Sequence, residues 1–373
     1  MTDLEPILAL WHELRDAGRE YVLATVVAVE GPSYRKPGAR MLLGSDGRRA
    51  GTVSGGCLEA EIARRAWWLT DAGPSLEWYS TAPDDEDRPY GSGCGGSVQI
   101  LLERMTTADS VLSALEAAFH ARAALAIATV ISGPQTGRRA FAGTSTPSSD
   151  AATDAPLIHI ASQTLQNLTS GQMRCELEMG LARVYAEYCA PRPGLWIFGA
   201  GDDAKPLLAL AEQLGWYVVI ADGRSHLANT SRFPQADLIQ TLAIQDLPGT
   251  SSSIPVQSAD AAVVMTHSFD QDAHILAALL TMQPAPRYMG VLGPQQRTRE
   301  LLMKAALLRG FSANDDQVER ELAALHAPMG LDLGGETPAD IALSILAEIQ
   351  QTLSNATALP LRTVRRDVPV ALR

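Results

Sequence analysis

Residues 195–222, which decide the fold of the second half of the chain, read LWIFGAGDDAKPLLALAEQLGWYVVIAD. An apolar run leads into Gly199–Gly201, a helical pattern of leucines and alanines ends at Gly215, and a second apolar run ends at Asp222. The order of strand, glycine turn, helix and strand is typical of a nucleotide-binding βαβ unit. This stretch therefore predicts a Rossmann-like domain.

The glycine turn predicts a ligand less firmly than it predicts the fold. Gly199 would permit the turn, Gly201 would let the backbone approach a phosphate at the helix N-terminus, and Asp222 stands where an acid meets a ribose hydroxyl. Asp202 and Asp203 at the helix start favour another interpretation, because one of them would cap the helix and repel a phosphate. Both interpretations stay open at this point.

The remainder of the second half alternates between strand and helix patterns. Apolar runs near 261–265 and 287–292 indicate strands, and the helices that we expect lie near 271–281, 295–309 and 338–350. This alternation predicts a doubly wound parallel sheet, whose ligands lie beyond the carboxyl ends of the strands. Arg224 and His267 follow two such ends. His267 would hydrogen-bond a ligand there or cap the next helix.

Length, charge and composition set the limits for the whole chain. Its 373 residues favour two domains, and a net charge of −12 argues against nucleic acid as a main partner. Its four cysteines are too few for a disulfide framework and fit a reducing cytoplasm. The acidic N-terminal segment lacks the positive charge of a signal peptide, and no apolar run approaches membrane-spanning length.

The pattern before the βαβ unit predicts an N-terminal α+β domain. Strands are expected at 21–29 and 97–103, and helices at 58–70 and 175–189. Pro191–Gly194 reads as a linker. The expected domains are residues 1–190, residues 191–357 and a basic tail at 358–373.

Two glycine-cysteine motifs stand out in the first domain. In Ser54–Glu59, Gly55 and Gly56 precede Cys57 at a helix start, which suits a thiolate or an anion cradle, or else a tight turn with a small buried cysteine. In Gly91–Gly96, Cys94 is followed by Gly95 and Gly96. That glycine density indicates close backbone approach to a ligand or a strand, or else a flexible loop.

A basic cluster is the third candidate site of the first domain. Arg35, Lys36 and Arg40 lie in and beside the loop GPSYRKPGAR within an acidic chain. They would receive a phosphate or an acidic partner, or form an ordinary solvated loop.

Taken together, these motifs resemble the XdhC/CoxI family, the xanthine dehydrogenase accessory proteins. The resemblance spans most of the chain and follows the family order. Its most specific motifs are TVSGGCLE at 52–59, GSGCGG at 91–96, FGAGDDAKPL at 198–207, VMTHSFDQD at 264–272 and GLDLGGETP at 330–338.

The resemblance implies a molybdenum cofactor chaperone rather than an enzyme. Such proteins hold the cofactor, in its molybdopterin form or as a nucleotide derivative, support its sulfuration and insert it into a molybdenum hydroxylase apo-enzyme. A cysteine desulfurase and a second copy of the chain are the other implied partners. By motif match, Cys57 and Cys94 are the residues expected to contact the cofactor and its molybdenum.

The residue types suit this role, because an anionic pterin needs backbone donors and a few cations. The glycines of both cysteine motifs would supply the donors, and the basic cluster with Arg224 would supply the charge. The competing hypothesis is an NAD(P)-dependent oxidoreductase. It would use Gly199, Gly201 and Asp222 for the cofactor and His267 as its acid or base, and it leaves both cysteine motifs without a role.

Overall fold

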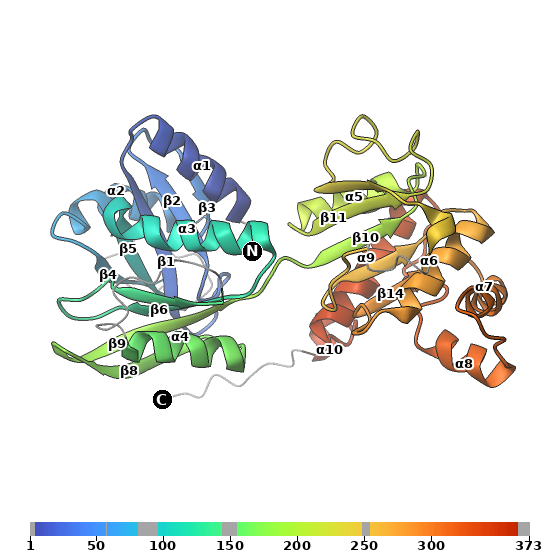
Figure 1. The fold of residues 1–373 in the computed structure, drawn as a ribbon. Coiled ribbons are helices and arrows are strands. Elements are labelled where there is room, and N and C mark those ends of the chain that lie inside the picture. Colours follow the sequence, from blue (N-terminus) through green and yellow to red (C-terminus); the bar gives the residue numbers. More distant parts are fainter. Residues whose placement is uncertain (1–3, 57, 81–95, 144–154, 248–253, 365–373) are drawn as a thin grey trace. The chain divides into compact units, whose positions relative to one another are not determined.

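The chain forms two compact units that meet in sequence at Arg192 and Pro193. The structure is a computed structural model that describes residues 4–56, 58–80, 96–143, 155–247 and 254–364 (Figure 1). The described part of the expected tail, residues 358–364, is grouped with the second unit. Within the described ranges, no helix has both the length and the apolar character needed to cross a membrane.

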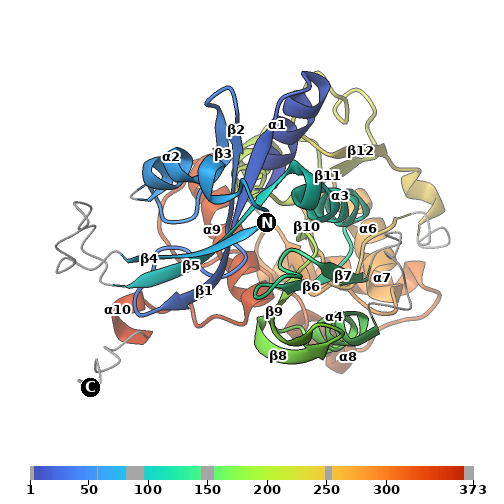
Figure 2. The same cartoon turned by 90° about the vertical axis from the view of Figure 1, so that its left-hand side faces the viewer.

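The first unit is built on an antiparallel sheet with the strand order β3-β2-β1-β5-β4. Figure 2 shows α2 on one side of this sheet and α1 with α3 on the other, and separate buried clusters fill the two sides. The elements are β1 (Tyr21–Glu30), β2 (Arg40–Gly44), β3 (Arg49–Gly51), β4 (Ser75–Ser80), β5 (Ser97–Arg104), α1 (Leu4–Asp16), α2 (Glu59–Leu69) and α3 (Met105–Ala121).

A second antiparallel sheet completes the first unit, in the order β7-β6-β9-β8. Helix α4 covers one of its faces, while Tyr185 and Ile131 on the other face pack against Val27 and Leu101 of the first sheet. Its elements are β6 (Leu125–Val130), β7 (Arg139–Ala142), α4 (Ala155–Asn167), β8 (Gly171–Leu177) and β9 (Gly180–Cys189).

The second unit contains a parallel sheet in the order β12-β11-β10-β13-β14. Helices α5 and α9 cover one face, and α6, α7 and α8 cover the other. The elements are β10 (Gly194–Phe198), α5 (Ala204–Gln213), β11 (Tyr217–Asp222), β12 (Leu238–Thr241), η1 (Ile244–Asp246), β13 (Ala261–Val264), α6 (Phe269–Thr281), β14 (Tyr288–Val291), α7 (Gln295–Leu308), α8 (Asp315–Ala323), α9 (Pro338–Ser354) and α10 (Leu361–Val364).

The strand order of the parallel sheet fixes where a crevice forms. From β10 the chain first builds outward through β11 and β12 and then returns to add β13 and β14 on the other side. The order therefore reverses between β10 and β13, and ligands of doubly wound sheets bind at the carboxyl ends of the strands at this reversal. Gly199–Gly201 and Thr266–His267 follow these two strands.

The predicted fold class is confirmed, with one element that the sequence analysis assigned wrongly. A helix was expected at 175–189, but these residues belong mainly to the hairpin β8–β9. Strand β9 pairs with β6 on its other edge, and Val184, Tyr185 and Ala186 are buried in succession. A central strand that is covered on both faces has no alternating polar side, so its periodicity resembles that of a buried helix.

Candidate functional site

The turn between β3 and α2 is organised by one carboxylate. Glu59 is 4% exposed, and its Oε2 accepts hydrogen bonds from Ser54 Oγ at 2.6 Å and from Gly56 N at 2.9 Å. The Glu59 carboxylate also accepts from Thr52 Oγ1 and from the backbone N–H groups of Val53, Ser54, Gly55 and Leu58. Burial raises the pKa of Glu59, but these hydrogen bonds outweigh it and lower that pKa to about 2.

This turn is therefore an anion nest that is filled by the chain itself. The N–H groups at Gly55 and Gly56 converge on an anion, as the cradle hypothesis requires, but the anion is Glu59. Both glycines have positive φ values, of 89° and 119°. Cys57 lies outside the described residues.

The described ends of the two glycine-cysteine motifs both contact the loop 31–38. A methyl group at Gly55 would lie 2.7 Å from Cδ1 of Tyr34, and one at Gly96 would lie 2.1 Å from the carbonyl oxygen of Pro32. Arg35 Nε also donates to Thr52 O at 3.1 Å. The described ends of both motifs thus lie against one loop. Cys94 and Gly95 lie outside the described residues.

The predicted basic cluster divides into surface and interior residues. Lys36 is exposed and Arg35 is half-buried. Arg40 is only 8% exposed, and its guanidinium forms a two-pronged pair with the carboxylate of Glu187 on β9. Arg40 therefore joins the two sheets of the first unit. The expectation that it receives a ligand phosphate does not agree with this geometry, because its charge is already neutralised inside the protein.

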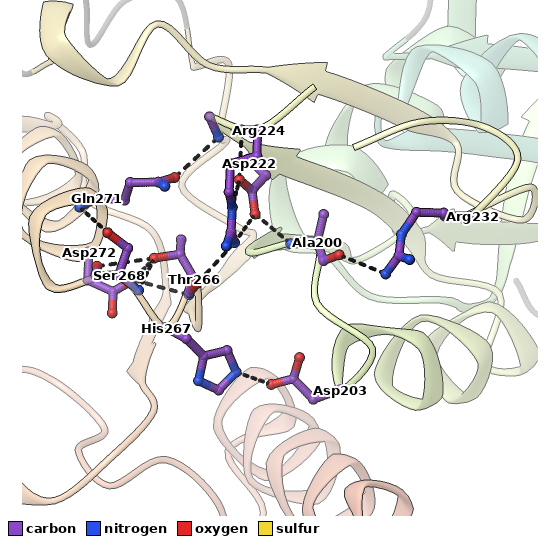
Figure 3. A network of polar contacts seen from close by, with 11 residues as sticks. Ala200, Asp203, Asp222, Arg224, Arg232, Thr266, His267, Ser268, Gln271 and Asp272 are labelled. Atoms are coloured by element: carbon purple, nitrogen blue, oxygen red, sulfur yellow. Dashed lines mark hydrogen bonds and ion pairs between the residues drawn. The ribbon is translucent and has the colours of Figure 1, made fainter. Parts of the chain in front are cut away.

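The glycine turn of the second unit is held by Asp222, which is fully buried. Its two carboxylate oxygens accept from Ala200 N at 2.8 Å, from Arg224 N at 2.8 Å, and from Arg224 Nε and Nη2 at 2.9 and 2.8 Å. Figure 3 shows Arg224 between Asp222 and Thr266, whose carbonyl oxygen it also contacts at 3.0 Å. Burial raises the pKa of Asp222, but these contacts lower it overall.

These contacts correct the role predicted for Asp222 and Arg224. Each oxygen of Asp222 already accepts two hydrogen bonds, so the carboxylate is not offered to a ribose hydroxyl. The positive charge of Arg224 is paired with the same carboxylate. Gly199 has a φ of 136°, and a methyl group there would lie 2.5 Å from Met265 O. Its small size is therefore required by the approach of the chain after β13.

The aspartates at the start of α5 bind side chains rather than capping the helix. Asp202 pairs with Lys205 at 2.8 Å and with Arg232 at 3.0 Å. Asp203 makes no side-chain cap hydrogen bond, and its Oδ2 lies 2.7 Å from His267 Nε2 (Figure 3). The capping interpretation of these residues is wrong, because their carboxylates turn toward Lys205, Arg232 and His267 instead.

His267 lies at the predicted place after β13, with a φ of 60° and an exposed ring. A left-handed conformation is uncommon for a residue other than glycine and concentrates at functional sites. The helix that follows is capped by Ser268, which accepts from Gln271 N. Helix capping, one of the two roles expected for His267, is therefore performed by Ser268.

A cavity of about 270 Å³ opens beside His267. Met265 and Leu292 give it apolar walls, and it is also lined by His267, Asp272, Gly293 and Arg297. Asp272 is 1% exposed and accepts from Thr266 Oγ1 and Arg297 Nη2, both at 2.6 Å. Among the described residues no three His, Cys, Asp or Glu side chains gather as a metal site.

Comparison with known proteins decides the family. A model of the XdhC Rossmann domain matches residues 195–349, and a model of the XdhC and CoxI family matches residues 14–80. A Bacillus subtilis (strain 168) protein described as a probable xanthine dehydrogenase subunit is 32% identical over 353 residues, which are 92% of this chain and 97% of that protein. The chain belongs to the XdhC and CoxI family.

Two further relatives of this XdhC/CoxI protein cover nearly its full length. A crystal structure of a xanthine dehydrogenase from Bacillus halodurans superposes with a TM-score of 0.71 at 27% identity, covering 98% of this chain and 100% of that one. The molybdenum cofactor insertion chaperone PaoD of Escherichia coli (strain K12) is 25% identical over 356 residues, 93% of this chain and 88% of PaoD. The family resemblance seen in the motifs is thereby confirmed.

Three site residues of this XdhC/CoxI protein were not predicted individually. Glu59 and Asp272 lie within the quoted motifs TVSGGCLE and VMTHSFDQD, so membership of a motif could have pointed to them. No motif in the sequence pointed to Arg297. Glu59 and Asp272 are buried acids that organise a turn and a strand end. Their roles depend on which N–H groups converge in space, and spacing along the chain does not show this.

Proposed function

We propose that this protein binds molybdenum cofactor, supports its sulfuration and inserts it into a xanthine dehydrogenase-type molybdenum hydroxylase. The observation that carries the proposal is that Gly55 and Gly96, each from one cysteine motif, both lie against the loop 31–38. One relative is named a molybdenum cofactor insertion chaperone, which supports the proposed cargo. Another is named a probable xanthine dehydrogenase subunit, which supports the proposed client.

The cargo is an anionic pterin with a phosphate and a soft molybdenum–sulfur centre. In the proposed site, Cys57 and Cys94 supply thiolates toward that centre, because soft thiolate ligands suit a soft metal. Gly56, Gly95 and Gly96 would let the backbone approach the cargo, whereas the space over Gly55 is taken by the ring of Tyr34. The exposed Lys36 and the neighbouring Arg35 provide the positive charge that an anion requires in a chain with a net charge of −12.

Within the second unit, the crevice is proposed as a separate site for a phosphate- or nucleotide-bearing ligand. His267 and Arg297 line the cavity beside Gly199 and Gly201, and about 270 Å³ is a volume for part of a ligand rather than for a dinucleotide. The oxidoreductase hypothesis fits the geometry less well. It needs Asp222 as the ribose acceptor, and this carboxylate is buried and saturated with internal hydrogen bonds.

In this proposal the client is a molybdenum hydroxylase apo-enzyme, the sulfur donor is a cysteine desulfurase, and the carrier acts as a homodimer. Each of these is a separate binding event. Each is measured by mixing the purified proteins and recording their masses in solution.

The deciding experiment measures retention and transfer of the cargo. Purified full-length protein is incubated with molybdenum cofactor released anaerobically from a donor enzyme, and NAD and NADP are titrated in parallel. We expect retained cofactor, transfer to an apo-hydroxylase and no tight nicotinamide binding. Tight nicotinamide binding without retained cofactor would overturn the proposal.

Substitution of the motif cysteines tests their assigned role. Cys57→Ser and Cys94→Ser are expected to weaken cofactor retention by roughly tenfold each, equivalent to about 1.4 kcal/mol. Cys175→Ser is the matched control, because Cys175 is a half-buried free cysteine on β8. Equal retention by all three variants would remove Cys57 and Cys94 from the site.

A further inference from the structure

The loop 31–38 places an aromatic ring beside the Glu59-filled turn. Tyr34 is 73% exposed, and a methyl group at Gly55 would lie 2.7, 3.1 and 3.2 Å from three of its ring carbons. The ring therefore occupies the space where any other residue at position 55 would have its side chain. One part of the ring lies over the turn, and most of it is open to solvent.

An exposed aromatic residue by itself needs no explanation, because much of any protein surface is apolar. Tyr34 differs because the backbone on both sides of it is fixed. Ser33 Oγ donates to Arg35 O at 2.9 Å, and Arg35 Nε donates to Thr52 O at 3.1 Å. At the base of the loop, Gly38 N donates to Val26 O of β1 at 2.8 Å. An ordered aromatic ring binds with little loss of conformational entropy.

The support under the ring is ordered as well. Gly55 N donates to Thr52 Oγ1 at 3.0 Å and to Glu59 Oε1 at 3.2 Å, which fixes the turn on which the ring rests. Gly96, the described end of the second cysteine motif, lies against Pro32 of the same loop. Tyr34 thus stands where both motifs meet a single loop.

We propose that Tyr34 is a stacking platform for the pterin ring of the cargo, with Gly55 beneath it as the residue that leaves room for the ring. This inference rests on the proposed function and adds a specificity-determining residue to it. A pterin is a flat heteroaromatic system, and such rings bind offset against aromatic side chains. The platform selects the organic part of the cargo.

Binding of a free pterin tests the platform without any loaded enzyme. Neutral 6-hydroxymethylpterin is titrated into the full-length protein, and quenching of its own fluorescence reports stacking. Stacking on one aromatic residue is worth about 1–3 kcal/mol, so Tyr34→Ala is expected to weaken binding roughly 5- to 150-fold. Tyr34→Phe keeps the ring face and is expected to stay within about threefold of the wild-type protein.

Trp68→Ala is the matched control. Trp68 is another exposed aromatic residue of the same unit, 58% exposed near the end of α2 and nine residues after the buried Glu59. Its removal is expected to leave pterin binding unchanged. Both substituted side chains, Tyr34 and Trp68, are exposed, so the melting temperatures of the three variants are expected to stay within about 2 °C of wild type.

Retention of the whole cofactor separates the two proposals. A wild-type protein that retains no cofactor overturns the carrier function. If the wild-type protein retains cofactor and Tyr34→Ala retains it equally well, the carrier stands and the platform falls. Unchanged binding of 6-hydroxymethylpterin by Tyr34→Ala, or equal losses in Tyr34→Ala and Trp68→Ala, would also overturn the platform.

Discussion

At the residue scale, Glu59 is the residue on which the first cysteine motif depends. Its pKa of about 2 lies below the ordinary value of 4.5, so its ionised form stabilises the folded state above pH 4.5. That contribution is lost as the pH falls from 4.5 toward 2. Allowing for solvent near the exposed Gly55 and Gly56, we estimate it at about 2 kcal/mol.

Glu59→Gln is therefore expected to lower the free energy of unfolding by about 2 kcal/mol at pH 7 and by much less at pH 3. The amide keeps the shape of the side chain but turns a donor toward N–H groups that need an acceptor. Urea unfolding at the two pH values measures the difference. Glu61→Gln, in the first turn of the same helix, is the control. A loss of equal size at both pH values would contradict the assigned charge.

At the element scale, Gly199 and Gly201 test how the βαβ unit is assembled. A methyl group at Gly199 would meet backbone, 2.5 Å from Met265 O, and Gly199 has a φ of 136°. A methyl group at Gly201 would instead meet the end of the Asp203 side chain, 2.4 Å from Oδ1. The backbone at Met265 cannot move away without separating β10 from the chain after β13, whereas the Asp203 carboxylate can rotate away.

Gly199→Ala is therefore expected to destabilise the protein by about 3 kcal/mol, and Gly201→Ala by about 1 kcal/mol or less. Gly201→Ala should also displace the Asp203 carboxylate from His267, which the NMR chemical shifts of the His267 ring can follow. Equal destabilisation by the two substitutions would show that the approach of β13 is not what requires glycine at 199.

The same elements show what the sequence could predict. The parallel sheet was predictable, because β10, β11, β13 and β14 are apolar runs that alternate with clear helix patterns. The short, half-buried β12 is the exception. The hairpin at β8–β9 was not, because Glu, Leu, Met and Ala in that segment favour a helix until pairing with β6 overrides them.

The turns were predictable in place but not in their contacts. The turns at Gly55 and Gly199 and the strand end before His267 were expected from their residues alone. The partners of Asp222, Arg40 and Asp203 were not, because Arg224, Glu187 and His267 reach them only through side-chain directions in the folded chain. A charge seen in sequence does not show whether the protein itself has already neutralised it.

At the scale of the whole molecule, each unit has the interior that a domain needs. Buried clusters around α1, α2, α3 and α4 fill the first unit, and those on the two faces of the parallel sheet fill the second. A unit with its own core can unfold as its own cooperative transition. We therefore expect calorimetry of the full chain to resolve two transitions.

The two stability variants assign these transitions. Glu59→Gln is expected to lower the melting temperature of one transition and Gly199→Ala that of the other, because each residue belongs to a different core. A loss of about 2–3 kcal/mol in a domain of this size corresponds to a shift of roughly 4–12 °C. In the double variant the two shifts should appear together and unchanged, since sites that share no contacting residues act additively. A single transition that both substitutions move would mean that the protein unfolds as one cooperative body, and a ligand bound in either unit would then stabilise both.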